Sequence, residues 1–212
     1  MRPLFTVHAG EFIVGEFIEQ TFRNLNVWLP SKDTGIDFLV TDKKNKSTVS
    51  LQVKLSRDYR QPEAVDDFQQ GLVAAGWLTL SHEKIEKSQA NYWVFVLVSN
   101  ERKWTPHFIV IKPVDLLARL RRIHGNKRSY HFYPWIINTN DNSRIALQGR
   151  GLNANERLSL MRDGIKDEDR NFTTFLENWS ALEKLNKIIL GLQSYKVAVL
   201  CRSETRLLHL LF

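Results

Sequence analysis

Cysteine is almost absent from this chain of 212 residues, which contains only Cys201. A single cysteine excludes an internal disulfide and a cysteine-rich zinc site, and it favours a reducing compartment. The neighbours of Cys201 are apolar, unlike the surroundings of an activated thiolate. The six histidines are scattered along the chain without the spacing of a zinc site.

Long apolar runs are also missing. No segment approaches the roughly 20 apolar residues that a membrane-spanning helix needs, and the first residues lack the apolar segment of a signal peptide. We therefore expect a cytoplasmic protein with no membrane partner. Neither the phosphate loop that ends in Gly-Lys nor the Gly-x-Gly-x-x-Gly fingerprint of dinucleotide-binding folds is present.

Positive charge is plentiful but unevenly distributed. The formal net charge is +7, with a pI of about 9.6. Residues 1–100 hold 11 Lys/Arg against 12 Asp/Glu, whereas residues 101–212 hold 19 against 11. A basic surface favours polyanions, and nucleic acid is the partner we expect, although basic composition alone is common among globular proteins.

Two predicted strands joined by a hairpin dominate the first half. Residues 35–40 and residues 49–56 follow the strand pattern, with a polar connection at residues 42–47. The second strand alternates strictly, so that Gln52 and Lys54 project from the face opposite Val53. An ammonium within a strand needs a partner or a function, and Asp37 on the neighbouring strand is the obvious candidate.

A predicted helix over residues 9–25 precedes this hairpin. Its apolar side chains share one face, and Glu11 lies on that same face. Glu16 projects from another side. The simplest explanation of Glu11 is a favourable interaction with the helix dipole in the first turn.

In this order, a helix acid, Gly-Ile-Asp37, a hairpin and Gln52-Val-Lys54 resemble the signature of the PD-(D/E)XK, or restriction-endonuclease-like, nuclease superfamily. Two positions depart from it: Ile36 stands where proline is usual, and Gln52 stands where an acid is usual. The Gln-x-Lys form is similar to that of Mrr-like restriction enzymes. The resemblance covers roughly residues 8–56.

The resemblance implies a catalytic set and a metal. Asp37 would be the central ligand of Mg²⁺, for which Mn²⁺ would substitute, and Glu11, with Glu16 in reserve, would hold the metal directly or through water. Gln52 would offer its amide oxygen and Val53 its backbone carbonyl, while Lys54 would orient or deprotonate the attacking water. Without such a site, Asp37 and Lys54 would form only a cross-strand ion pair, worth roughly 0.2–1 kcal/mol.

The rest of the chain predicts further elements. Strands are expected over residues 91–99 and 106–112, and helices over residues 63–80 and from Pro113 to the stop at Gly125. An aromatic strand-like segment spans residues 129–137; its Tyr130, Phe132, Tyr133 and Trp135 would stack bases if exposed, although aromatic side chains at this density more often form core. A helix over residues 171–192, a strand over residues 195–200 and an apolar tail over residues 207–212 complete the chain.

Together these elements predict an α/β fold. The resemblance implies a restriction-endonuclease-like core, αβββαβ, whose mixed central sheet is flanked by helices, with a largely helical C-terminal extension. The core would occupy residues 1–128 and the extension residues 129–212, packed on it, with a single domain as the alternative. Contacts with the nucleic-acid backbone are expected from a set of basic residues: Arg57, Arg60, Arg102, Lys103, Arg119, Arg121, Arg122, Lys127 and Arg128.

The expected function is metal-dependent endonucleolytic cleavage of DNA, in restriction, defence or repair. One alternative is a nuclease-derived module that binds nucleic acid without cutting it, and another is a nuclease directed at RNA. Cleavage of both strands of a duplex would favour a homodimer.

Overall fold

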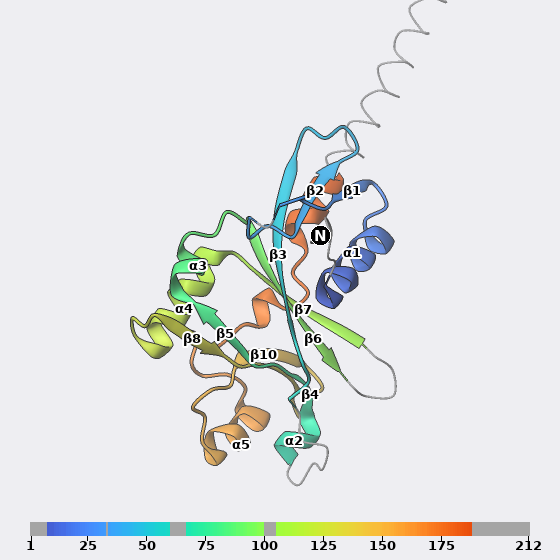
Figure 1. The fold of residues 1–212 in the computed structure, drawn as a ribbon. Helices are drawn as coiled ribbons and strands as arrows, with labels where there is room; N and C mark the ends of the chain where they lie inside the picture. The colour runs from blue at the N-terminus through green and yellow to red at the C-terminus, as the bar shows by residue number, and fades with distance from the viewer. Residues whose placement is uncertain (1–7, 33, 60–66, 100–104, 188–212) are drawn as a thin grey trace, which may run out of the picture.

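The fold is described here by a computed structural model, which covers residues 8–32, 34–59, 67–99 and 105–187 (Figure 1). In chain order the elements are α1 (Ala9–Thr21), β1 (Leu25–Trp28), β2 (Phe38–Asp42), β3 (Thr48–Ser56), α2 (Asp67–Gly71), β4 (Leu72–Ala75), β5 (Leu78–Ser81), α3 (His82–Glu86), β6 (Tyr92–Ser99), β7 (Thr105–Ile111), α4 (Pro113–His124), β8 (Ser129–Phe132), β9 (Pro134–Asn138), β10 (Arg144–Gln148), α5 (Ala154–Asp163) and the 3₁₀ helix η1 (Thr173–Phe175).

A mixed sheet in the order β1-β2-β3-β6-β7 forms the centre of the molecule. Strands β3 and β6 pair in parallel and place Gln52 opposite Trp93, whereas the other neighbours are antiparallel. The four strands predicted from the sequence therefore lie side by side. The fifth strand, β1, begins within the range for which a helix was predicted, residues 9–25, so that prediction is wrong at its C-terminal end. That helix ends at Thr21, and Leu25 instead opens an edge strand that pairs with Asp42.

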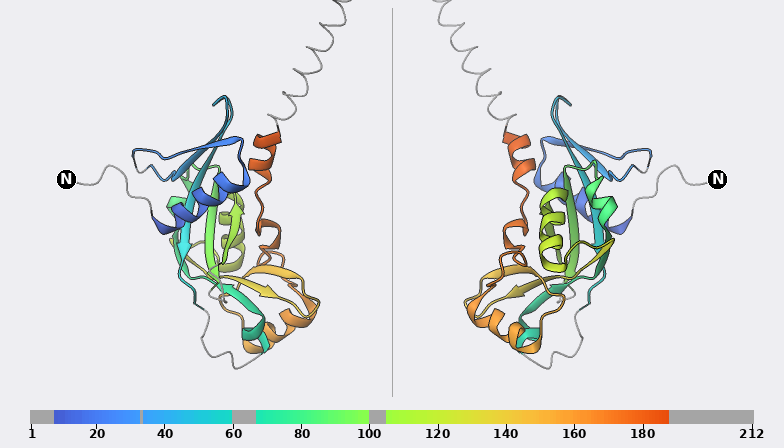
Figure 2. Two further views of the ribbon diagram at one scale, coloured as in Figure 1. Left: turned by 90° about the vertical axis from the view of Figure 1, so that its right-hand side faces the viewer. Right: turned by 90° about the vertical axis from the view of Figure 1, so that its left-hand side faces the viewer.

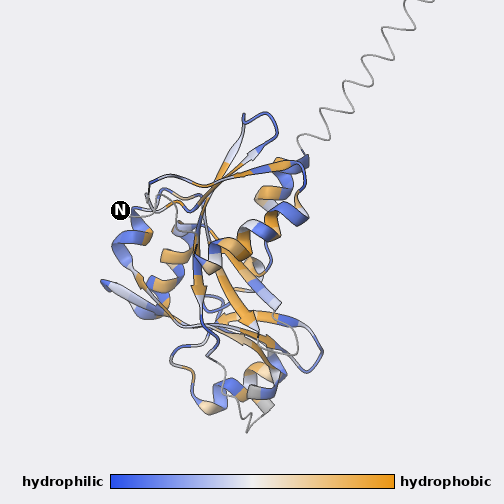
Figure 3. Cartoon of the chain, turned by 45° about the vertical axis from the view of Figure 1, so that its right-hand side comes forward, coloured by the Kyte–Doolittle hydropathy of each residue, from blue (hydrophilic) through white to orange (hydrophobic). Residues whose placement is uncertain are grey.

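Helices cover both faces of this sheet, so that the molecule has three layers here (Figure 2). Helix α1 and the helical residues 180–187 pack on one face, where Val14 and Ile18 meet Leu182 and Leu185 in one core cluster. The other face is covered by α3 and α4, whose Ile85 and Leu116 share a second cluster with Trp93. Apolar residues gather along the central strands between these layers (Figure 3). The predicted α/β class and helix-flanked mixed sheet are confirmed.

The expected helix over residues 63–80 is wrong in its second half. Residues 60–66 lie outside the described residues, and the helix seen after them ends at Gly71. Two short strands follow, β4 and β5, which pair with β9 and β8. The run from Leu72 to Ala75 is buried at every position, and Gly76 lies so close to Leu97 that a Cβ there would collide with it at 2.6 Å. Continuous burial suits a covered strand better than a helix with one polar face.

The C-terminal part is less helical than expected. Strands β8, β9 and β10 precede α5, and two of them pair with strands from before residue 128. The predicted helix over residues 171–192 is replaced by isolated bridges at Asn171 and Leu176, the short η1 and a helical segment at residues 180–187. Phe172 is fully buried there, so the chain is held against the sheet before the helix starts. The segments predicted at residues 195–200 and 207–212, and Cys201, lie outside the described residues.

Helix α4 follows the prediction closely. Pro113 occupies its first turn, and Gly125 ends it with a φ of +73°. Within the described part of the chain, no helix combines the length and the apolarity that crossing a bilayer requires.

Candidate active-site cavity

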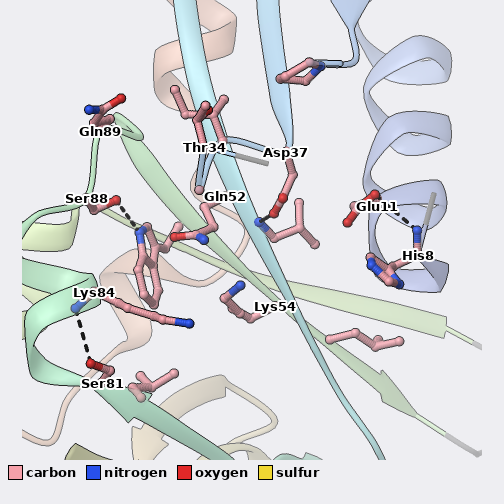
Figure 4. A pocket seen from close by; sticks show the side chains of 18 of the residues that line it. His8, Glu11, Thr34, Asp37, Gln52, Lys54, Ser81, Lys84, Ser88 and Gln89 are labelled. Carbon is pink, nitrogen blue, oxygen red and sulfur yellow. Dashed lines mark hydrogen bonds between the residues drawn. The ribbon is translucent and has the colours of Figure 1, made fainter. Parts of the chain in front are cut away.

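An open cavity of about 1340 Å³ lies where the N-terminus of α1, the start of β2, the middle of β3 and the region around α3 converge (Figure 4). Glu11, Asp37, Gln52 and Lys54 all line it, and they come from three separate elements or their ends. Residues 1–7 and 33 lie outside the described residues. The cavity thus brings together the four side chains that the sequence pattern singled out, and the backbone of Val53 with them.

Asp37 marks the point at which β2 and β3 separate. The last regular pair of the two strands is Phe38 with Leu51, and the Asp37 N–H still donates to the Leu51 carbonyl at 2.8 Å. Beyond it the carboxylate replaces the departing backbone: Asp37 Oδ2 accepts the N–H of Val53 at 2.6 Å. Gly35, with a φ of +77°, allows the turn that leads into this position. One carboxylate oxygen therefore anchors the fork, and the other, Oδ1, has no protein donor among the described residues.

Gln52 and Lys54 project from β3 on the face opposite Val53. The indole of Trp93, which is 1% exposed, lies beneath them on β6, and the Lys54 ammonium is 5.8 Å from its ring centroid. Trp93 is itself held by its indole N–H, which donates to Ser88 Oγ at 2.8 Å. A cation over the face of an indole is stabilised without a carboxylate partner. Among the described residues Lys54 forms no ion pair, so the cross-strand pair with Asp37 is not made.

Glu11 enters from the first turn of α1 because the helix approaches β3 closely. Gly10 permits this approach: a Cβ at that position would lie 2.8 Å from the Cβ of Leu55. The Glu11 Oε2 accepts the backbone N–H of His8 at 3.1 Å, which is the helix-end role expected of an acid in the first turn. Among the described residues no hydrogen bond to Oε1 is formed, and Glu11 lines the cavity. Glu16, the reserve candidate, is exposed, bonds to Gln20 and does not line the cavity.

Helix α3 supplies lysines that the sequence pattern did not reveal. Lys84 and Lys87 line the wall opposite β3, and Figure 4 shows the Lys84 and Lys54 side chains both directed into the cavity. Lys87 is paired with Glu83 at 2.8 Å, and this exposed pair raises the pKa of Lys87 and lowers the pKa of Glu83 through a hydrogen bond and charge attraction. Within the described chain Lys84 has no such partner. No periodicity marks these residues; β5, which leads into α3, and α4, which packs against it, hold α3 at the cavity.

The basic residues predicted to contact a nucleic-acid backbone differ in their surroundings. Arg119 is used inside the protein, where its guanidinium lies over Phe175 and donates to backbone carbonyls, including that of Asn171. Arg121 and Arg122 pair with Glu86 and Asp169. Both of these arginines are nevertheless exposed, as are Arg57, Lys127 and Arg128. The remaining three predicted residues lie outside the described residues, namely Arg60, Arg102 and Lys103.

The donor set of the cavity suits a hard cation. Two carboxylates, one amide oxygen and a backbone carbonyl are the oxygen ligands that Mg²⁺ accepts, and Mg²⁺ usually keeps several waters as well. In the described part of the chain, no three His, Cys, Asp or Glu side chains are close enough to form a metal site by themselves. A cation bound here would therefore depend on Gln52, the Val53 carbonyl, water or a phosphate oxygen to complete its shell.

Comparison with known proteins adds no relative: no protein-family model, no curated protein and no solved structure matches this chain. The function must be argued from the cavity itself.

Proposed function

We propose that the chain is a metal-dependent nuclease of the PD-(D/E)XK type that hydrolyses phosphodiester bonds of DNA. One observation carries the proposal: Glu11, Asp37, Gln52 and Lys54, which the sequence pattern singled out from three separate segments, all line one cavity. Asp37 comes from the start of β2, Gln52 and Lys54 come from β3, and Glu11 comes from the helix that precedes both strands.

The order of the elements supports the same proposal. Helix α1 is followed by the antiparallel strands β1, β2 and β3, then, after an insertion, by helix α3 and by β6, which pairs in parallel with β3. This is the helix–three strands–helix–strand order of a restriction-endonuclease-like core. The segment with α2, β4 and β5 would be an insertion between the third strand and the second helix.

Each residue has a definable task in such a reaction. Asp37 and Glu11 would hold the cation with one carboxylate oxygen each, while their other oxygens keep the strand fork and the helix end in place. When bound, Mg²⁺ would lower the pKa of a coordinated water and compensate charge on the phosphate. Lys54 Nζ would orient that water and stabilise charge developing on the phosphate oxygens.

Gln52 makes the site less acidic than its Glu-containing counterparts would be. Its amide oxygen can coordinate a cation but brings no negative charge, so weaker metal binding is expected in the absence of DNA. A phosphate oxygen of the substrate would supply the missing anionic ligand. Metal affinity and substrate affinity should therefore reinforce each other.

A plasmid assay tests the proposal. Supercoiled DNA is incubated with the wild-type protein in Mg²⁺, Mn²⁺ or EDTA, beside Lys54→Met and Lys44→Met. Methionine keeps an apolar stem over Trp93 but removes the ammonium, whereas Lys44 is exposed on the turn between β2 and β3 and serves as the matched control. We expect nicking that requires the metal, is unchanged in Lys44→Met, and falls by at least about 100-fold in Lys54→Met, the lower end for a group that moves a proton.

Two results would replace the proposal with a different function. DNA binding that is equal in Mg²⁺ and EDTA, without nicking by any variant, would identify a module that binds without cutting. Metal-dependent cleavage of RNA but not of DNA would assign the same chemistry to the other nucleic acid. Equal nicking by all variants would indicate a contaminating nuclease.

A further inference from the structure

Three aromatic side chains form a continuous exposed cluster beside the cavity: Tyr59, Trp77 and Tyr133, here called the aromatic ridge. The ring centroids of Tyr59 and Trp77 are 5.3 Å apart, and those of Trp77 and Tyr133 are 5.6 Å apart. Tyr59 and Trp77 each leave 48% of their surface exposed, and Tyr133 is half-buried. The neighbouring Tyr130 and Phe132 are buried in the core, so they cannot take part in such a surface cluster.

Hydrogen bonds of the backbone join the segments that carry the ridge. The N–H of Trp77 donates to Ser56 Oγ at 2.8 Å, and the N–H of Gly76 donates to the carbonyl of Pro134 at 2.8 Å. The N–H of Tyr59 donates to the carbonyl of Ala75 at 2.9 Å. Three segments far apart in the sequence are thereby tied together. Rings that are already ordered lose little conformational entropy when they bind a ligand.

The ridge continues directly from the proposed site. Ser56, whose Oγ accepts the N–H of Trp77, follows Lys54 by two residues, and its side chain projects from the same face of β3. At about 3.3 Å per strand residue the two positions are about 7 Å apart. Leu78 and Thr79, which follow Trp77, line the cavity itself.

Cationic groups accompany the rings. The guanidinium of Arg150 lies 5.6 Å from the Tyr133 ring centroid, and Arg57 is exposed at the end of β3, just before Tyr59. Asp58, between them, is half-buried and already has a partner within the protein. Exposed aromatic rings interleaved with arginines, at the edge of a cavity that contains further lysines, match a nucleic-acid strand whose bases stack while its phosphates meet the cations.

We infer that the aromatic ridge binds unpaired bases of a single-stranded nucleic-acid segment that leads into the cavity. The inference rests on the proposed function for the role of the cavity, and it narrows the substrate to nucleic acid with a single-stranded segment beside the cleaved phosphate. A uniform duplex would not bind the ridge by stacking, because its bases are stacked on one another and cannot reach the rings. Stacking tolerates every base, so the ridge selects for unpaired structure and not for sequence.

Binding in EDTA tests the inference separately from cleavage. A short labelled oligonucleotide is titrated as single-stranded DNA, as single-stranded RNA of the same sequence, and as the DNA duplex, with anisotropy as the readout. Trp77→Ala should weaken single-strand binding by roughly 5- to 150-fold, the effect of losing one stacked base, and Trp77→Phe should restore most of it. Trp28→Ala is the matched control, since Trp28 is 49% exposed on the edge strand β1 and its indole donates to Thr41. That variant should bind as the wild type does.

Circular dichroism and thermal melting establish that each variant is folded. If Trp77→Ala does not fold, Tyr59→Ala decides, because Tyr59 contributes an equally exposed ring. Tighter binding of either single strand than of the duplex, lost in Trp77→Ala and kept in Trp28→Ala, supports the ridge; the stronger of the two strands identifies DNA or RNA. Equal binding of single strand and duplex, or equal loss in both tryptophan variants, overturns it. Single-strand binding without metal-dependent cleavage of either the plasmid or the single-stranded oligonucleotides would leave the ridge standing and refute the nuclease. Metal-dependent cleavage without preferential single-strand binding would support the nuclease and overturn the ridge.

Discussion

Asp37 has two separable tasks, and two substitutions distinguish them. Its Oδ2 accepts the N–H of Val53 at the point where β2 and β3 diverge, and its charge is the proposed central ligand of the cation. Asp37→Ala removes both the hydrogen bond and the charge. Asp37→Asn removes only the charge, because the amide oxygen can still accept the N–H of Val53.

The structure sets the size of each effect. A hydrogen bond to a charged acceptor stabilises a protein by roughly 1.5–3 kcal/mol, and an unpaired buried N–H costs roughly 1–3 kcal/mol. For a chain of this size each kcal/mol lowers the melting temperature by about 2–4 °C. We therefore expect Asp37→Ala to melt roughly 2–12 °C below the wild type. Asp37→Asn keeps a neutral hydrogen bond about half as strong, so its melting temperature should fall by less than that of Asp37→Ala.

Nicking activity should not distinguish the two variants as stability does, because both of them lack the charge of Asp37. Loss of an outer partner of a metal ligand already costs about 10- to 100-fold, so both variants should lose at least about 100-fold in metal-dependent nicking. Thermal melts by circular dichroism and the plasmid assay on the same preparations provide both numbers. Wild-type nicking by Asp37→Asn would show that the carboxylate only supports the strand fork. An Asp37→Ala protein as stable as the wild type would refute the role of the fork hydrogen bond.

Three further substitutions test other parts of the structure. Gly10→Ala places a Cβ 2.8 Å from the Cβ of Leu55. Overpacking costs about 1–3 kcal/mol, whereas replacing glycine by alanine in a helix gains about 1 kcal/mol, so we expect a lower melting temperature. An unchanged or higher melting temperature would contradict the close approach of α1 to β3. Lys84→Met should weaken DNA binding and reduce the slope of log affinity against log salt concentration by about one. Lys44→Met, at an exposed turn, serves as the reference. Equal slopes for the two variants would exclude a phosphate contact at Lys84. Burial, and then nearby positive charges, lower the pKa of His124 from its usual 6.5. Between the two pKa values His124 is protonated in the unfolded chain but neutral in the folded protein. The free energy of unfolding should therefore fall as pH drops from about 6.5 towards the lowered pKa. Denaturant titrations across that pH range should show this loss in the wild type and a flatter profile in His124→Gln.

Individual strands were predictable because their signals are local. Alternation along residues 49–56 and the apolar run at residues 91–99 each describe a strand without reference to the rest of the chain. Pro113 and Gly125 likewise delimit α4 through their own backbone preferences. Errors arose where pairing decides: residues 72–81 and 171–176 have apolar side chains compatible with a helix, but β9, β8 and β7 are there to pair with them.

The candidate site shows the same division. Asp37, Gln52, Lys54 and Glu11 could be named because their residue types and order resemble a known nuclease signature. Lys84 and the aromatic ridge could not, since Tyr59, Trp77 and Tyr133 are distant in sequence and their segments are brought together by hydrogen bonds of the backbone and of Ser56. Of the four rings considered for base stacking, Tyr130 and Phe132 are buried, whereas Tyr133 belongs to the aromatic ridge.

The sequence by itself determined the α/β class, the strands of the central sheet and the candidate catalytic side chains, because side-chain periodicity and residue chemistry are properties of short segments. Only the tertiary structure decided which cations and rings share the space around Lys54, and which arginines, such as Arg119, are used within the protein. The physical reason is that long-range strand pairing and the burial of side chains select one arrangement among many that the local pattern allows.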